Sequence, residues 1–66
     1  MDNIVILWKS TEGKVIDTWY DRKIFREFQE KYNATDKALA KFILDIINKD
    51  SEFECSEILH VREVSF

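Results

Sequence analysis

Five consecutive apolar residues, Ile4 to Trp8, form the longest apolar run in this 66-residue chain and limit what it can fold into. The run is far shorter than the ~20 residues that a membrane-spanning helix needs. Its length and branched side chains favour a strand over residues 3–9. Both faces of that strand are apolar, with Ile4, Ile6 and Trp8 on one and Val5 and Leu7 on the other. In a strand with one solvent-exposed face, apolar and polar residues alternate. Here they do not, so we expect a central strand that is covered on both sides.

The residues after this strand predict a hairpin. Ser10 to Gly13 reads as a turn, and it places the chain's one glycine where a positive φ is tolerated. Residues 14–20 then alternate along a returning strand.

Two helices are expected next. Asp21 is suited to cap the first, whose apolar stripe consists of Ile24, Phe25, Phe28 and Tyr32. Asn33 is suited to end that helix in a left-handed conformation, and Thr35 to cap the second, which extends to about Lys49. A polar loop over 50–56 precedes a last strand over 57–66.

These elements predict one small α+β domain over residues 1–66, in the order β-β-α-α-β. We expect two layers, a three-stranded sheet with both helices on one face, because a domain of this size has a single core. Following the chain direction, we expect the last strand to run parallel to the first, beside it, through a right-handed crossover.

One helix layer would leave a face of the central strand open. A soluble monomer rarely exposes a contiguous apolar patch, so we infer that this face binds a second copy of the chain or a partner protein. The alternative is that C-terminal residues such as Phe66 fold over it. Aromatic residues are enriched at interface hot spots. The strand residues that we expect at this interface are Ile6, Trp8, Trp19 and Tyr20.

The net charge and the cysteine content of the chain exclude some classes of function. Thirteen acids against ten bases give a net charge of −3, which argues against non-specific nucleic-acid binding. The segment Asp45 to Glu57 is strongly acidic. It is either a solvated loop or a negative lobe that steers the chain onto a basic, nucleic-acid-binding protein. The acids that we add to the expected interface are Glu52, Glu54 and Glu57. One unpaired cysteine, and an N-terminus without a basic stretch, indicate a cytoplasmic protein.

The chain has few residues that could act in catalysis. His60, the chain's one histidine, would need Asp17 or Glu63 to orient it as a general base, and a polar strand position explains it better. Cys55 has acids around it, which disfavour a thiolate and hence a nucleophile. We predict no catalytic residue, no metal site and no cofactor, because calcium-loop and phosphate-loop spacings are missing from the sequence.

The sequence therefore predicts a non-enzymatic protein-interaction module, expected to form a homodimer. Small size, acidity and richness in Ile, Lys, Asn and Asp are typical of accessory proteins of phages and mobile elements, which often inhibit or modulate a host protein. The alternative is a small nucleic-acid-binding domain that stacks bases on the sheet aromatics beside Lys9 and Arg62.

Overall fold

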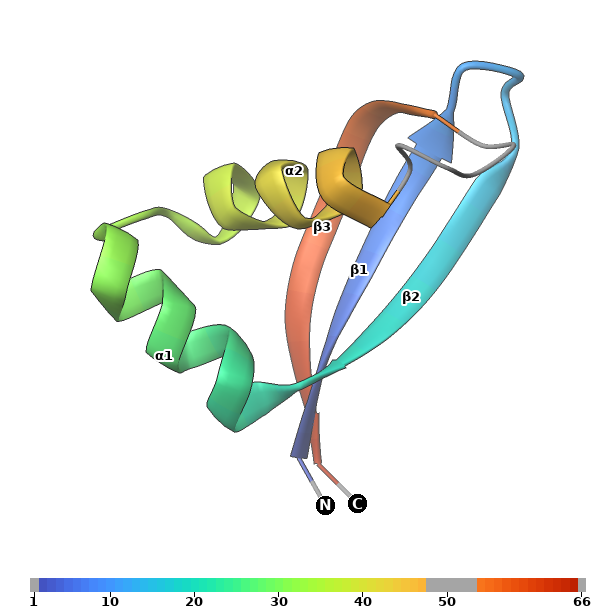
Figure 1. Cartoon of the computed structure of the whole chain (residues 1–66). Helices are drawn as coiled ribbons and strands as arrows, with labels where there is room; N and C mark the ends of the chain where they lie inside the picture. The colour runs from blue at the N-terminus through green and yellow to red at the C-terminus, as the bar shows by residue number, and fades with distance from the viewer. Residues whose placement is uncertain (1, 48–53, 66) are drawn as a thin grey trace.

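The computed structural model describes residues 2–47 and 54–65, and these form the predicted α+β architecture. The elements follow the order β-β-α-α-β (Figure 1). Their bounds are β1 (Asp2–Ser10), β2 (Val15–Asp21), α1 (Arg22–Tyr32), α2 (Asp36–Ile47) and β3 (Cys55–Ser65). β3 begins two residues earlier than predicted, so Cys55 belongs to the strand and not to the loop. The predicted end of the second helix near Lys49 lies outside the described residues.

The hairpin turn between β1 and β2 forms as predicted. Gly13 has a φ of +87°, a conformation that costs a glycine nothing and strains a residue with a side chain. The buried Ser10 accepts a bond from the Gly13 N–H through its carbonyl and one from the Lys14 N–H through its hydroxyl. A further bond, from the Thr11 N–H to the Glu54 carbonyl at 2.9 Å, fastens the turn to the segment that leads into β3.

Three capping residues set the helix ends, all as predicted. The Asp21 carboxylate accepts a bond from the Ile24 N–H at 3.0 Å, so α1 begins directly where β2 ends. Asn33 takes up a left-handed conformation, with φ 50°, and ends α1. The Thr35 hydroxyl accepts a bond from the Ala38 N–H at 3.1 Å at the start of α2.

The described strands form a sheet of order β2-β1-β3, with β1 in the centre as predicted. The predicted direction of β3 is wrong, because β3 pairs with β1 antiparallel. Following the chain direction makes β3 parallel to β1 only if each helix crosses the whole length of the sheet. Instead α1 runs obliquely away from the end of β2, and α2 runs back across the sheet (Figure 1). The two helices together therefore bring the chain back along the sheet only once. β3 therefore starts at the end of the sheet where β1 finishes.

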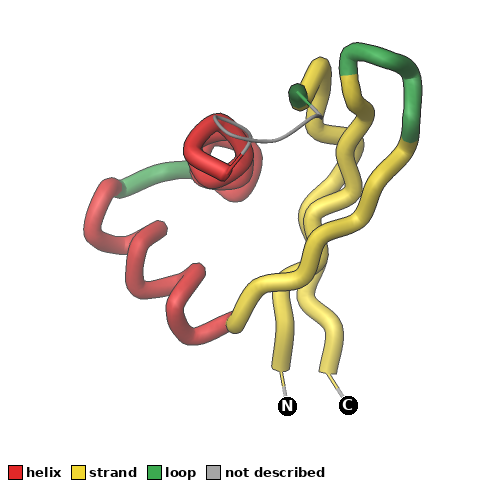
Figure 2. Tube along the Cα trace, turned by 45° about the vertical axis from the view of Figure 1, so that its right-hand side comes forward, coloured by secondary structure: helices red, strands yellow, loops and turns green. Residues whose placement is uncertain are grey.

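Both helices lie on the same side of the sheet, as predicted (Figure 2). Alternate residues of β1 face them and join the core, namely Ile4, Ile6 and Trp8. The helices contribute Phe25, Leu39, Ala40 and Leu44 to the same core. Phe25 is the buried residue of α1, because this helix leaves the sheet at the end of β2 and then leans away from it (Figure 2).

Candidate protein-docking surface

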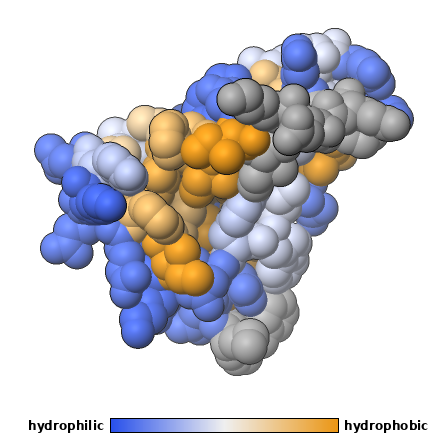
Figure 3. Space-filling view, viewed as in Figure 1, coloured by the Kyte–Doolittle hydropathy of each residue, from blue (hydrophilic) through white to orange (hydrophobic). Residues whose placement is uncertain are grey.

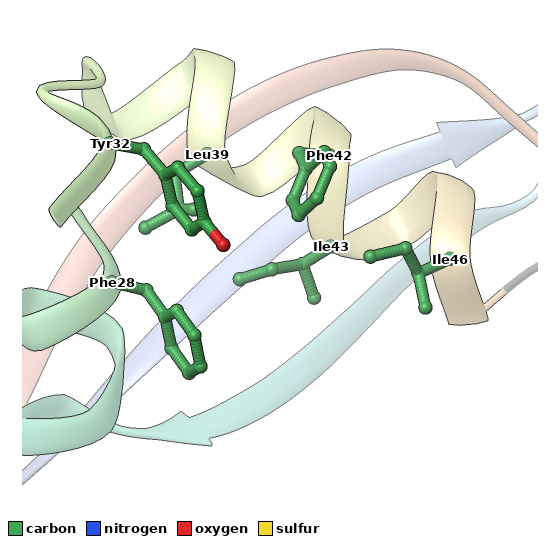
Figure 4. Close-up of a pocket in the computed structure, with 6 residues that line it drawn as sticks. All are labelled: Phe28, Tyr32, Leu39, Phe42, Ile43 and Ile46. Atoms are coloured by element: carbon green, nitrogen blue, oxygen red, sulfur yellow. The ribbon is translucent and has the colours of Figure 1, made fainter.

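A groove runs between α1 and α2, and we refer to it as the helix groove. It has a volume of about 370 Å³, and the side chains that line it are Phe28, Tyr32, Leu39, Phe42, Ile43 and Ile46. All six are hydrophobic, and they converge from the two helices on one space (Figure 4). A smaller hollow of about 210 Å³ shares Tyr32, Leu39 and Phe42 with it. The helix groove offers apolar surface and shape, the two ingredients of a binding site for an apolar segment.

Aromatic contacts hold the walls of the groove in place. The rings of Phe28 and Tyr32 are stacked one turn apart on α1, with centroids 6.2 Å apart. Tyr32 reaches across to Phe42 of α2, with centroids 6.0 Å apart and the ring planes tilted by 48°. Edge or tilted geometry at this distance stabilises an aromatic pair beyond its burial alone. The walls are therefore preformed.

The same side chains are exposed to an unusual extent. Phe28 is 45 % exposed, Tyr32 54 %, Phe42 52 % and Ile46 59 %, and Ile24 on the first turn of α1 is also more than half exposed. They gather into an apolar patch over the two helices (Figure 3). Among the described residues, nothing covers this patch from outside.

The opposite flank of α1 is polar, and ion pairs and hydrogen bonds attach it to β3 and α2. Arg26 bonds Glu63 of β3 at 2.6 Å and Asp36 of α2 at 2.8 Å, and Gln29 also donates to Asp36. The bond to Glu63 raises the pKa of Arg26, and the bond from Gln29, helped by Arg26, lowers the pKa of Asp36. We call these residues the Arg26 network. It holds α1 to both β3 and α2, so the groove walls keep their spacing.

One charged side chain stands beside a lining residue of the groove, and a charged pair lies on another side of α2. Lys31 lies 5.5 Å from the Tyr32 ring centroid on α1. On α2, Lys41 pairs with Asp45 at 3.0 Å, and this bond raises the pKa of Lys41. This pair lies away from the groove, because Lys41 also donates to the Cys55 carbonyl of β3 at 3.2 Å.

The face of the sheet away from the helices, the open sheet face, differs from the expected apolar patch. Its rows follow from the strand register, with Trp19, Val5 and Arg62 in one row and Asp17, Leu7 and His60 in the next. Val5 is only 2 % exposed although it stands outside the core cluster. Side chains on flanking strands reach their cross-strand neighbours, so Trp19 and Arg62 shield Val5. Polar residues thus interrupt the apolar ones on this face.

The structure separates the aromatic and aliphatic residues that were expected together at an interface. Placing Ile6 and Trp8 on an uncovered face is wrong, because they are 0 % and 3 % exposed beneath the helices. Tyr20 is also on the helix side, half-buried against the core. Trp19, 48 % exposed, lies on the open sheet face.

The acids of the expected interface lie elsewhere. Glu54 and Glu57 are exposed near the start of β3, and Glu57 pairs in register with Lys9. Glu52 lies outside the described residues, as does Phe66, which was the alternative cover for the open face.

Sequence reasoning missed the helix groove, although a signal for it was present. The four-residue spacing of Ile24, Phe28 and Tyr32 marks a second apolar flank beside the buried Phe25. On α2 the apolar stripe is likewise wider than one small sheet requires. Two broad stripes on neighbouring helices indicate that part of each remains uncovered.

His60 and Cys55 are not assembled into a catalytic pair. They lie on opposite faces of the sheet, because Cys55 belongs to the buried core on the helix side and His60 pairs with Leu7 on the open sheet face. Asp17 lies two strands away from His60, and Glu63 is engaged by Arg26. Burial raises the pKa of the Cys55 thiol, and Asp45 and Glu57 reinforce this shift against the opposing charge of Lys41.

In residues 2–47 and 54–65, no group of three or more His, Cys, Asp or Glu side chains could hold a metal ion. Neither described helix combines the length and apolar character that crossing a membrane requires. No known protein family matches this chain, and no significant match to it was found among curated proteins or solved structures.

Proposed function

We propose that this chain is a non-enzymatic protein-interaction module that docks through the helix groove. The observation that carries the proposal is the exposure of Phe28, Tyr32, Phe42 and Ile46 around a preformed apolar groove. Exposed apolar area of this kind is characteristic of interaction sites. Five of the six lining side chains are hydrocarbon and Tyr32 alone among them carries a hydroxyl, which favours binding over catalysis.

A finer role is part of the same proposal. We propose an accessory protein of a phage or mobile element that modulates or inhibits a larger host protein. Glu54 and Glu57 support it, because they are exposed and Glu57 faces away from the helix groove. The acids and the helix groove are separate surfaces. A basic surface on the larger protein could therefore bind the acids while another apolar surface binds in the groove.

The test places a photo-cross-linking amino acid, benzoylphenylalanine, in the tagged full chain. One variant carries it in place of Phe42 in the groove, and its control carries it in place of Trp19 on the open sheet face. The two sites match closely in exposure, at 52 % and 48 %. We expect protein adducts after irradiation in a bacterial lysate from position 42 and few from position 19. Adducts from position 19 alone, or from neither position, would contradict docking through the groove.

The second candidate function, single-stranded nucleic-acid binding, rests on the row that brings Trp19 and Arg62 together on the open sheet face. Aromatic rings beside arginine can stack bases. Only Trp19 can report stacking, because Trp8 is buried. Titration with a single-stranded oligonucleotide at low salt should quench the fluorescence of a Trp8→Phe variant and leave that of a Trp19→Phe variant unchanged. A flat titration with both variants would remove this candidate.

A further inference from the structure

We infer that the occupant of the helix groove is a second copy of this chain, joined by a two-fold axis that brings the two helix layers face to face. The inference rests on the proposed function and names its partner. It replaces the open sheet face, where self-association was expected from the sequence, with the surface formed by α1 and α2.

The exposed area fits a dimer. Five side chains, Ile24, Phe28, Tyr32, Phe42 and Ile46, are each between 45 % and 59 % exposed. At roughly 200 Å² for a large apolar side chain, they leave on the order of 500 Å² of apolar surface on each molecule. A stable interface buries about 800 Å² per partner, of which about 65 % is apolar in homodimers. The patch therefore supplies the apolar share of one such interface.

The shape of the surface is self-complementary. The groove has a ridge on each side, Phe28 and Tyr32 on α1 and Phe42 and Ile46 on α2 (Figure 4). Helices pack when the ridges of one enter the grooves of another. A two-fold axis across the groove would set a ridge of each copy into the groove of the other, which satisfies both surfaces with one contact.

Charge and rigidity favour the same occupant. The six side chains that line the groove carry no charge, so two copies can meet there without charge repulsion. The Arg26 network fixes the walls beforehand, so little conformational entropy is lost when the copies meet.

Sedimentation of the full chain over roughly 1–100 µM tests the inference, since interfaces of standard size have dissociation constants from micromolar downward. We compare Ile46→Lys in the groove with the matched control Val15→Lys on the edge strand β2. Both residues are branched, and they are 59 % and 60 % exposed. We expect a dimer for the unaltered chain, at least thirtyfold weaker association for Ile46→Lys, and a change below twofold for Val15→Lys. Circular dichroism confirms that each variant is folded, and Phe42→Gln provides a second groove variant if Ile46→Lys does not fold.

The other outcomes separate the inference from the proposed function. A monomer at the highest concentration, with protein adducts still formed from position 42, would overturn the second copy and leave docking through the groove intact. A dimer that Val15→Lys weakens and the groove variants do not would place self-association on the strands and overturn the inference. A monomer without any adduct would overturn both. An apolar small molecule found by mass spectrometry in the unaltered protein, and lost from Ile46→Lys, would also overturn both.

Discussion

The two faces of the sheet differ in how their apolar side chains are buried. On the open sheet face, Val5 is almost fully buried with no described helix over it, and its cross-strand neighbours Trp19 and Arg62 stand on either side of it. On the helix side, Phe28 and Phe42 stay half exposed although they belong to amphipathic helices. A central strand has a neighbour on each side, whereas each described helix has one helical neighbour at most. Burial thus depends on the number of flanking elements as much as on the hydrophobicity of the residue.

The largest effect is expected within α1, where a buried and an exposed phenylalanine lie three residues apart. Phe25 is 1 % exposed and Phe28 45 %. We expect Phe25→Ala to lower the free energy of unfolding by about 3–5 kcal/mol, which is comparable to the whole stability of a domain this small. Phe28→Ala should cost about 1 kcal/mol, because half of the ring is already in water. Urea denaturation below the concentration of association measures both.

Equal losses from the two variants would break the comparison. They would mean that Phe28 is covered within a single molecule, so that the helix groove is closed in solution.

A smaller effect is expected at Arg62, which we hold responsible for part of the cover over Val5. Removing its stem in Arg62→Ala should expose roughly 40 Å² of apolar surface and lower the free energy of unfolding by about 1 kcal/mol. Arg62→Met keeps most of the stem without the charge and should be nearly neutral. Thermal unfolding of both variants distinguishes shielding from an ionic role. A loss that follows the charge, present in both variants, would show that the open sheet face is stabilised electrostatically.

The smallest effect concerns the Arg26 network, which holds the groove walls. The pKa of Asp36 is lower in the folded chain than in the unfolded one, so the unfolded state takes up a proton first as the pH falls. The stabilisation from this carboxylate is complete above the ordinary aspartate pKa of 3.8 and disappears as the pH drops through the lower folded value. Because Asp36 is 43 % exposed, solvent screening keeps the contribution below about 1 kcal/mol.

Asp36→Asn tests this sign. Its free energy of unfolding should fall below that of the unaltered chain at pH 7, and the difference should shrink toward pH 3. A difference that is constant across this range would assign the effect to packing and not to the carboxylate.

The sequence predicts the local features of the fold well because they depend on short-range chemistry. The left-handed Asn33, the capping Asp21 and Thr35 and the glycine turn each follow from one side chain and its backbone neighbours. The direction of β3 does not follow from local chemistry, since it depends on the combined length and orientation of the two helices. The open and covered faces of β1 also look alike in sequence, and Val5 is hidden by residues from other strands.

The candidate site was less predictable for the same reason. The spacing of Ile24, Phe28 and Tyr32 identifies an apolar stripe, but the stripe alone does not say which part is covered. That depends on α1 leaning away from the sheet, which tertiary contacts decide. Exposed acids such as Glu54 could be named from the sequence, whereas a groove between two helices could not.

The pairing of β1 with β3 also bears on how the chain folds. Asp2 lies opposite Ser65, so one edge of the central strand is completed only by residues almost a full chain length away. Closing so long a loop costs entropy before any contact repays it, and pairings between distant residues slow folding. The β1–β2 hairpin and the capped helices can form locally and early. The rate-limiting event should then be the docking of β3, and substitutions along β3 should slow refolding more than equally destabilising ones in α1.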